Sequence, residues 1–104
     1  MIDFVDIKKL CETDCIRWTD HAIKRIIQRG IHRSDVKHVL THGEIIEQYP
    51  DDYPHPSCLA LGVTVDGSTI HVVCGIGNGE LWVISAYHPD PEKWTDRFSK
   101  RKEE

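Results

Sequence analysis

The chain has 104 residues, of which 39% are hydrophobic and 29% are charged, and this length and composition fit one soluble globular domain with no room for a second. The formal net charge of -4 argues against a protein that coats nucleic acid without specificity. No apolar run approaches the roughly 20 residues that a membrane span needs, and the first residues are acidic where a secretion signal would be basic. We therefore expect a cytoplasmic protein in which residues 1–104 form a single domain, with no cofactor.

The charges are divided unevenly along the chain. Residues 17–43 hold six Lys or Arg against Asp20 and Asp35, whereas every charged residue of 44–67 is acidic. The sequence thus predicts a basic helical half and an acidic strand half, and the acidic segment could dock a basic partner.

The four cysteines are Cys11, Cys15, Cys58 and Cys74. The first two are spaced C-x3-C rather than as a C-x2-C zinc knuckle, and no second close pair follows. We therefore expect reduced thiols that behave as small hydrophobic side chains.

The first half of the chain has the apolar spacing of helices. Residues 1–13 contain a short helix over 2–12, and residues 15–18 form an extended link. Each of the next two helices has a hydroxyl before it that can cap its first turn, and a glycine after it that can end it. These helices cover residues 20–29 and 35–42, with caps at Thr19, Gly30, Ser34 and Gly43.

After Gly43 the apolar period shortens toward 2 and β-branched residues increase, which predicts strands. The three prolines of residues 50–56 require a loop. Asp90 then begins a final helical turn that packs Trp94 and Phe98 on the body, and the tail 99–104 is frayed. The four predicted strands are 44–49, 57–65, 69–75 and 81–87.

The predicted fold class is therefore α+β, with N-terminal helices packed on a four-stranded antiparallel sheet. A two-residue turn at Asp66-Gly67 pairs Gly62 with His71. The helix-covered face then holds Leu59, Leu61, Val63, Ile70, Val72 and Cys74. His71 stands on the opposite face among small residues, in an open concavity.

The turn at residues 77–79 decides where Tyr87 lies, because a shift of one residue moves every side chain of a strand to the other face. A three-residue loop puts Tyr87 beside His71 and sends Trp82, Ile84 and Ala86 to the core. A two-residue loop instead buries Tyr87 with Leu81 and Val83. We favour the first, since it sends the larger apolar side chains inward.

The helix over 20–29 carries His21, Arg25 and Arg29 in consecutive turns on its polar side, with no glutamate between them. This stripe is either an ordinary solvated face or a site for a phosphate backbone, since a guanidinium binds phosphate oxygens through two parallel donors. On the second interpretation, Lys24, Arg29 and Lys93 contact RNA.

Cleavage of RNA without a metal needs a base for the 2′-hydroxyl, an acid for the leaving 5′-oxygen, and a cation at the phosphate. Imidazole, phenol and guanidinium groups supply all three, and DNA lacks the required hydroxyl. The candidate catalytic residues are His21, Arg25, His71 and Tyr87. A rival interpretation places a metal on His38 and His42, although no third ligand is evident.

A series of short motifs occurs in a fixed order over about residues 17–94. They are Trp18–Ala22, Arg25, Arg29–Ile31, Asp35, Gly43–Glu47, Tyr49, Leu61–Gly62, His71–Val73, Ala86–Tyr87 and Pro89. In their order and spacing they resemble the uncharacterised bacterial family called domain of unknown function 4258, with residues 14–98 as the family-like core.

That family is similar to RelE-type toxins and to the fold group that includes barnase and colicin nucleases. The resemblance implies a RelE/barnase-like sheet, metal-independent ribonuclease activity, and an antitoxin partner, often a small zinc-finger protein. It points to His21, Arg25, Arg29, His71 and Tyr87 as site residues. We therefore expect a toxin-type endoribonuclease; the alternative is a RelE-like module that binds a protein or RNA without cutting it.

Overall fold

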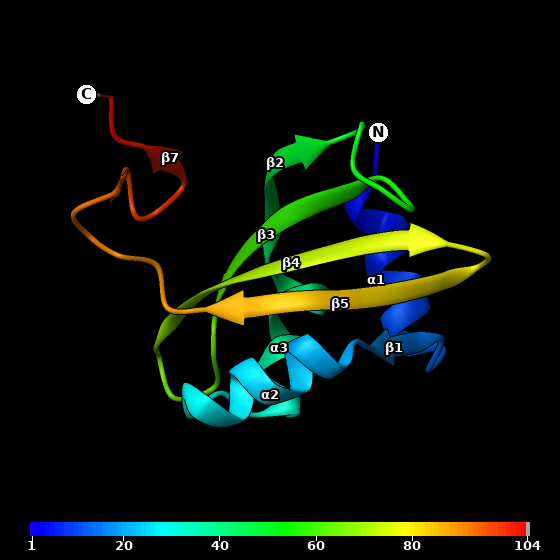
Figure 1. Ribbon diagram of the computed structural model, residues 1–104. Helices are drawn as coiled ribbons and strands as arrows, with labels where there is room; N and C mark the ends of the chain where they lie inside the picture. The colour runs from blue at the N-terminus through cyan, green and yellow to red at the C-terminus, as the bar shows by residue number, and fades with distance from the viewer. Residues whose placement is uncertain (104) are drawn as a thin grey trace.

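The structure is a computed structural model that describes residues 1–103. Three helices and a five-stranded sheet make up its body, and two short strands form a separate pair near the C-terminus (Figure 1). The helices are α1 (Phe4–Glu12), α2 (Asp20–Gln28) and α3 (Arg33–His42). The strands are β1 (Ile16–Trp18), β2 (Glu44–Tyr49), β3 (Ser57–Val63), β4 (Thr69–Gly77), β5 (Glu80–Tyr87), β6 (Trp94–Thr95) and β7 (Lys100–Arg101).

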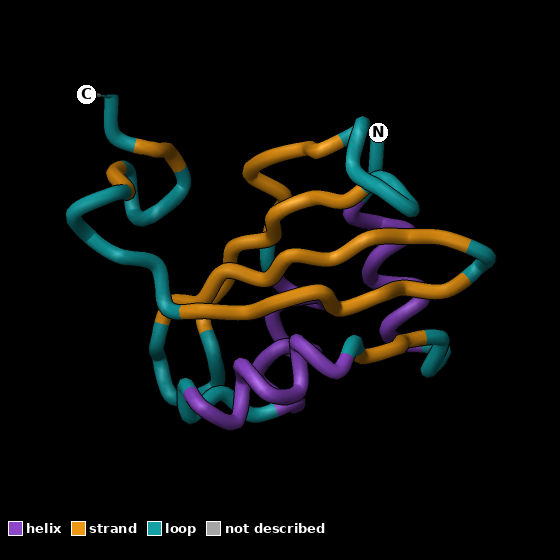
Figure 2. The backbone as a smooth tube through the Cα atoms, in the orientation of Figure 1, coloured by secondary structure: helices purple, strands orange, loops and turns teal. Residues whose placement is uncertain are grey.

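The sheet has the strand order β1-β5-β4-β3-β2, and its strands are drawn in orange in Figure 2. Strands β2 to β5 are antiparallel neighbours, in agreement with the predicted meander. The predicted extended link at 15–18 is a fifth strand, because Ile16 and Trp18 pair in parallel with Leu81 and Val83 of β5. The α+β class is thus confirmed, and the sheet is mixed rather than purely antiparallel.

The caps of α2 agree with the sequence. Thr19 Oγ1 accepts a hydrogen bond from the Ala22 N–H at 3.0 Å, and Gly30 has the positive φ of +67° that a C-terminal glycine provides.

Among residues 1–103, no helix is long and apolar enough to span a bilayer.

Helix α3 begins earlier than predicted, with His32 rather than Ser34 as its N-cap. The Asp35 carboxylate accepts a hydrogen bond from the His32 N–H at 3.0 Å, which ties the first turn to the cap. Gly43 does follow the helix, but in an extended conformation. A Cβ there would lie 2.3 Å from the Leu61 carbonyl oxygen, so the glycine is needed for a close approach of α3 to β3.

The predicted pairing of β3 with β4 is wrong by one residue, because Leu61, not Gly62, pairs with His71. The loop has three residues, 65–67, and is closed by a hydrogen bond from the Thr64 N–H to the Ser68 carbonyl. Gly67 takes the left-handed conformation that such a loop requires, at φ +91°. The helix-covered face of β3 therefore holds its small residues, and the three predicted core residues of this strand lie on the opposite face: Leu59, Leu61 and Val63.

The turn between β4 and β5 is the two-residue one, Asn78-Gly79, with positive φ at both residues. Leu81 and Val83 consequently enter the core, and the expectation that Trp82 and Ile84 do so is wrong. A β-bulge then shifts the register between Val73 and Cys74. Because the bulge inserts one extra residue in β5, the rest of the strand turns over. Tyr87 pairs with His71, and Ala86 faces the core as predicted.

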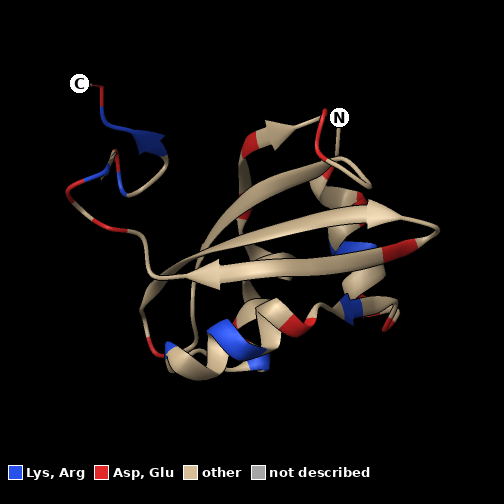
Figure 3. Ribbon diagram, viewed as in Figure 1, with Lys and Arg blue, Asp and Glu red and all other residues tan. Residues whose placement is uncertain are grey.

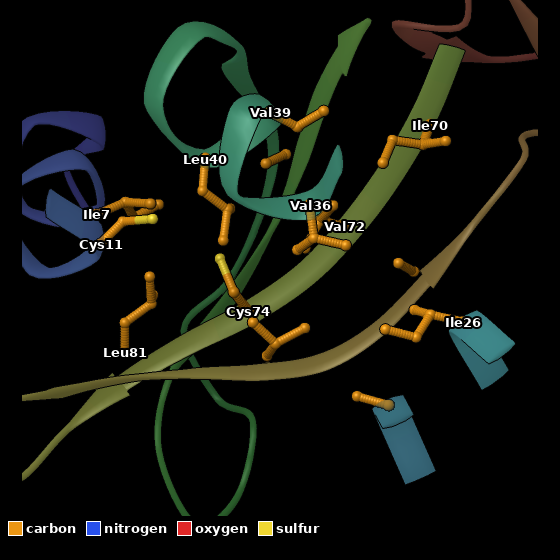
Figure 4. Close-up of a cluster of buried hydrophobic side chains, with 14 of the residues drawn as sticks. Ile7, Cys11, Ile26, Val36, Val39, Leu40, Ile70, Val72, Cys74 and Leu81 are labelled. Carbon is orange, nitrogen blue, oxygen red and sulfur yellow. The ribbon is translucent and has the colours of Figure 1, made fainter. Parts of the chain in front are cut away.

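The hydrophobic core lies between the three helices and one face of the sheet (Figure 4). Strand β4 supplies Ile70, Val72 and Cys74, all fully buried, and each large apolar side chain so buried contributes about 1.5–3 kcal/mol. The helices supply Ile7, Ala22, Ile26, Val36, Val39 and Leu40.

Asp90 begins a single turn as predicted, because its carbonyl oxygen accepts from the Lys93 and Trp94 N–H groups at 2.9 and 3.2 Å and its carboxylate accepts from the Glu92 N–H at 2.9 Å. The turn does not continue to Phe98, since β6 and β7 form a short hairpin there. Three consecutive residues in its connection have left-handed φ values of 50°, 57° and 69°: Asp96, Arg97 and Phe98. Trp94 packs on the body as predicted, at 6% exposure. The sequence predicts a frayed tail from 99, whereas Lys100 and Arg101 are paired in β7; Glu104 lies outside the described residues.

Candidate active site on the open face of the sheet

The side of the sheet opposite the helices, here called the open face, is covered in part by the C-terminal segment, residues 88–103. His71 lies on this face and is fully buried. The Trp94 ring covers it edge-on, with ring centroids 4.5 Å apart. The sequence predicts His71 in an open concavity, but the concavity is closed because the C-terminal segment folds back on the sheet.

The two ring nitrogens of His71 have different partners. Nε2 lies 2.8 Å from the Phe98 carbonyl oxygen, and because a carbonyl only accepts, Nε2 carries the hydrogen. In neutral His71 the other nitrogen, Nδ1, is then an acceptor. It lies 3.2 Å from the Tyr87 hydroxyl, which therefore donates to it.

Burial acts on both members of this pair. It lowers the pKa of His71 below the usual 6.5, because removal from water disfavours the imidazolium. It raises the pKa of Tyr87 above the usual 10.0, because it disfavours the phenolate. At neutral pH the pair therefore holds a phenol hydrogen-bonded to a neutral imidazole.

Beside this pair is a pocket of about 470 Å³, here called the basic pocket. Three of the predicted site residues meet there, namely Arg29, Tyr87 and Lys93. His71 lies directly behind it, in contact with Tyr87 and Trp94. The other lining residues are His88, Asp90, Trp94 and Arg101.

Two guanidinium groups in the basic pocket are held by neighbours. Arg29 Nη1 donates to the Ala86 carbonyl oxygen at 2.8 Å. Arg101 donates to both carboxylate oxygens of Glu47, at 2.9 and 3.1 Å, and lies 4.7 Å from the Trp94 ring centroid. A guanidinium has five N–H donors, so each keeps donors for an anion in the pocket.

Glu47 connects Arg101 to Tyr49 of the same strand. Burial raises the pKa of Glu47, but hydrogen bonds from Arg101 and Tyr49 outweigh burial, so the net shift is downward. Burial and the hydrogen bond to Glu47 raise the pKa of Tyr49 to about 12. The ion pair between Glu47 and Arg101 fixes the end of the C-terminal segment to β2.

The remaining predicted residues of α2 lie away from the basic pocket. His21, Lys24 and Arg25 do not line it, and Arg25 donates to Gln28 Oε1 at 3.1 Å. At a rise of 1.5 Å per residue, His21 is roughly 12 Å along the helix axis from Arg29. Basic residues gather on α2 and at β7, with acidic ones between β5 and β6 (Figure 3).

Sequence reasoning missed His88 and Arg101 as pocket residues. His88 could have been found, because it follows Tyr87 directly, just after the end of β5. Arg101 carried no usable signal, since its place depends on the fold of a tail that has no apolar periodicity.

The two histidines considered for a metal, His38 and His42, stack with centroids 4.3 Å apart and planes inclined by 18°. They line a second pocket of about 590 Å³ at the other side of the C-terminal segment. Within residues 1–103, no group of three or more His, Cys, Asp or Glu side chains is arranged to hold a metal ion.

Comparison with known families bears on the middle of the chain, from β1 to the end of β5. The family described as Domain of unknown function (DUF4258) matches residues 18–88. The chain belongs to this family. The match spans α2, β4 and β5, and hence Arg29, His71 and Tyr87, but stops before Lys93 and Arg101. No curated protein matches the chain. No solved structure matches it either.

Proposed function

We propose that this DUF4258 protein is a metal-independent endoribonuclease of toxin type that cleaves RNA at the basic pocket. The observation that carries the proposal is the meeting of Arg29, Lys93 and Arg101 around Tyr87, whose hydroxyl donates to a buried imidazole. These are the cation and proton-transfer groups that attack by a 2′-hydroxyl requires.

The three cations hold the phosphate. Arg29 and Arg101 are oriented in advance by the Ala86 carbonyl and by Glu47, so little side-chain freedom is lost when an anion binds. Lys93 is exposed and adds a flexible third charge. Asp90 and Glu47 offset part of this charge, which favours the single charge of a phosphodiester over more highly charged anions.

Proton transfer begins at Tyr87. The phenol oxygen takes the proton of the 2′-hydroxyl while its own proton passes to His71 Nδ1, so the phenol stays neutral. The 2′-oxygen then attacks phosphorus, and the bond to the 5′-oxygen breaks. His88, as the general acid, gives a proton to that leaving oxygen, which leaves a 2′,3′-cyclic phosphate and a 5′-hydroxyl.

His71 is in this scheme a positioning and relay residue, since it is buried and reaches the substrate only through Tyr87. Arg25, Lys24 and His21 are exposed or half-exposed along α2 beyond Arg29. We assign them contacts with phosphates next to the cleaved one, rather than the catalytic roles that their spacing suggested for His21 and Arg25.

The RelE/barnase-like relation is part of the proposal. Supporting it are the order of helices before an antiparallel meander and a basic site on the sheet face opposite α1 and α3. A cytoplasmic location and a cognate antitoxin, such as a small zinc-finger protein, follow from the same relation.

A second candidate is a non-catalytic module that binds RNA or a protein. The burial of His71 favours it, because His88 is then the one exposed imidazole among the described residues that line the basic pocket. Such a module would bind RNA in a salt-sensitive way and release no product.

One assay separates the candidates. A labelled RNA and an all-deoxy strand of the same sequence are incubated with the protein, with and without a chelator, and the products are analysed for their ends. We expect cleavage of the RNA alone, unaffected by the chelator, with cyclic phosphate ends. Cutting of both strands, or loss of cutting with the chelator, contradicts the mechanism; salt-sensitive binding without products favours the module.

A further inference from the structure

The second pocket differs in chemistry from the basic pocket, although the C-terminal segment borders both. Its sheet side is apolar, formed by Leu61 and Val63 of β3, and Phe98 of the C-terminal segment also lines it. Its charged residues are one base and one acid, Arg97 and Glu44. A phosphate gains little electrostatic attraction there, because the two charges oppose each other. An uncharged planar group with hydrogen-bond donors and acceptors at its edge fits this pocket better.

The stacked histidines add an aromatic wall to this second pocket. His38 is half-buried and His42 is exposed, so His42 is the outer ring of the stack. Nucleobases released from a helix stack on aromatic side chains, including histidine, and this stacking tolerates any base. The pocket thus offers a ring to stack on and polar groups for a base edge.

The two pockets lie on either side of His71. Leu61 and Tyr87 are its cross-strand partners on β3 and β5, and Leu61 lines the second pocket while Tyr87 lines the basic pocket. Directly opposed residues of antiparallel strands are about 5 Å apart, so the two linings are about 10 Å apart. Adjoining nucleotides of one strand can bridge that separation.

The C-terminal segment is shaped to border both pockets. Its left-handed turn at Asp96–Phe98 brings the Phe98 carbonyl to His71 and places Arg97 at the second pocket. Backbone conformations of this kind persist where the surrounding structure requires them, often at ligand sites.

We propose that the second pocket binds a nucleobase of the same RNA strand whose phosphate occupies the basic pocket. This inference rests on the proposed function and deepens it, since it makes the substrate single-stranded RNA with an unpaired base next to the cleaved bond. A base-paired nucleotide cannot enter, because its base edge and faces are already occupied in a duplex.

The test uses short strands with 2′-O-methyl riboses, which bind but cannot be cleaved. One base at a time is removed to leave an abasic sugar, and affinity is measured by fluorescence anisotropy. Loss of one particular base should weaken binding roughly 5- to 100-fold, the range of base–aromatic stacking, while loss of bases farther along should have little effect.

Variants assign the loss to the second pocket. His42→Ala should lose the preference for the intact strand, so that it binds the intact and the abasic strand with the same affinity. His42→Phe should restore this preference, because it restores an aromatic ring. Ser34→Ala, at an exposed position in the first turn of α3 and outside both pockets, is the control and should behave as the wild type.

The outcomes are distinguishable from failure of the proposed function itself. The base site is refuted, while phosphate binding stands, if the wild type binds every abasic strand as tightly as the intact one. It is also refuted if His42→Ala lowers the affinity for the intact and the abasic strand by the same factor, so that the preference for the intact strand remains. If no strand binds in a salt-sensitive way, the proposed function fails with it. Arg29→Gln should weaken all strands alike.

Discussion

Strand β4 buries Ile70 and Val72 on one face and His71 on the other to the same extent, but among different kinds of neighbour. Ile70 and Val72 are fully buried among aliphatic residues of the helices. His71, between them, is equally buried, but its neighbours are a phenol, an indole and a carbonyl oxygen. Burial alone therefore does not separate a core residue from a site residue; the chemistry of the partners does.

The helix-covered face should show the largest effect on stability. Replacing Ile70 with Ala removes buried methyl groups and leaves a cavity, so we expect the free energy of unfolding to fall by about 2–5 kcal/mol. Ile70→Val, the matched control, should cost only about 0.5–1.5 kcal/mol. Urea denaturation measures both, and a loss below 1 kcal/mol for Ile70→Ala would contradict the placement of β4 between core and site.

The open face should respond less, although Trp94 is larger than Ile70. A core Trp→Ala change costs about 3–5 kcal/mol, but Trp94 belongs to a surface hairpin that can relax, so we expect about 1–3 kcal/mol. Loss of this cover also readmits water to His71, so the pKa of His71 should rise toward 6.5.

An NMR titration of the His71 ring protons checks the second effect of Trp94→Ala. Trp94→Phe keeps an aromatic cover and should leave the pKa of His71 low. An unchanged pKa in Trp94→Ala would mean that the C-terminal segment does not keep water from the imidazole.

The ion pair between Glu47 and Arg101 should matter least to stability. Both side chains keep contact with water, so Glu47→Gln should cost about 0.2–1 kcal/mol. The same change removes an anion hydrogen-bonded to Tyr49, and the pKa of Tyr49 should fall from about 12 toward 10.0.

Ultraviolet titration of the tyrosines follows the pKa of Tyr49 in Glu47→Gln. Glu44→Gln, on the same strand but without a hydrogen bond to Tyr49, is the control and should leave that pKa in place. A pKa that stays near 12 in Glu47→Gln would refute the role given to the carboxylate.

Acid should weaken the fold through His71. Its pKa is lowered in the folded state, so the unfolded chain binds the proton more readily. Its contribution to stability is complete above pH 6.5 and declines as the pH falls from 6.5 through the lower folded pKa. Denaturation curves of the wild type and His71→Gln across this range should converge toward low pH; parallel curves would contradict the buried neutral imidazole.

The helices and most strand bounds could be predicted, because caps and apolar periods are local signals. Thr19 and Gly30 mark α2 by themselves. The register could not be predicted, since it depends on whether a turn has two or three residues. The first hairpin has a three-residue loop where we predict two, the second has the two-residue loop that we do not favour, and a bulge at Ile84 puts Tyr87 on the predicted side.

The sequence predicts those site residues whose position depends on a single helix or strand. Arg29 and His71 follow from helical spacing and side-chain alternation, whereas Tyr87 lies on the predicted side because of the bulge; the three residues come together. His21 and Arg25 share the helical stripe with Arg29 but lie too far along the axis, which spacing alone does not reveal. Glu47 and Arg101 meet across 54 positions of sequence, and no local pattern predicts such a contact.

The most direct test of the proposed chemistry is the rate of RNA cleavage by Tyr87→Phe, which deletes one hydroxyl. We expect a loss of about 10²–10⁴-fold relative to the wild type, the usual contribution of one proton transfer, with unchanged RNA affinity. Tyr53→Phe, at a 92% exposed tyrosine outside the basic pocket, should cleave at the wild-type rate. Equal rates for Tyr87→Phe and the wild type would contradict the assignment of Tyr87 and its buried imidazole to catalysis.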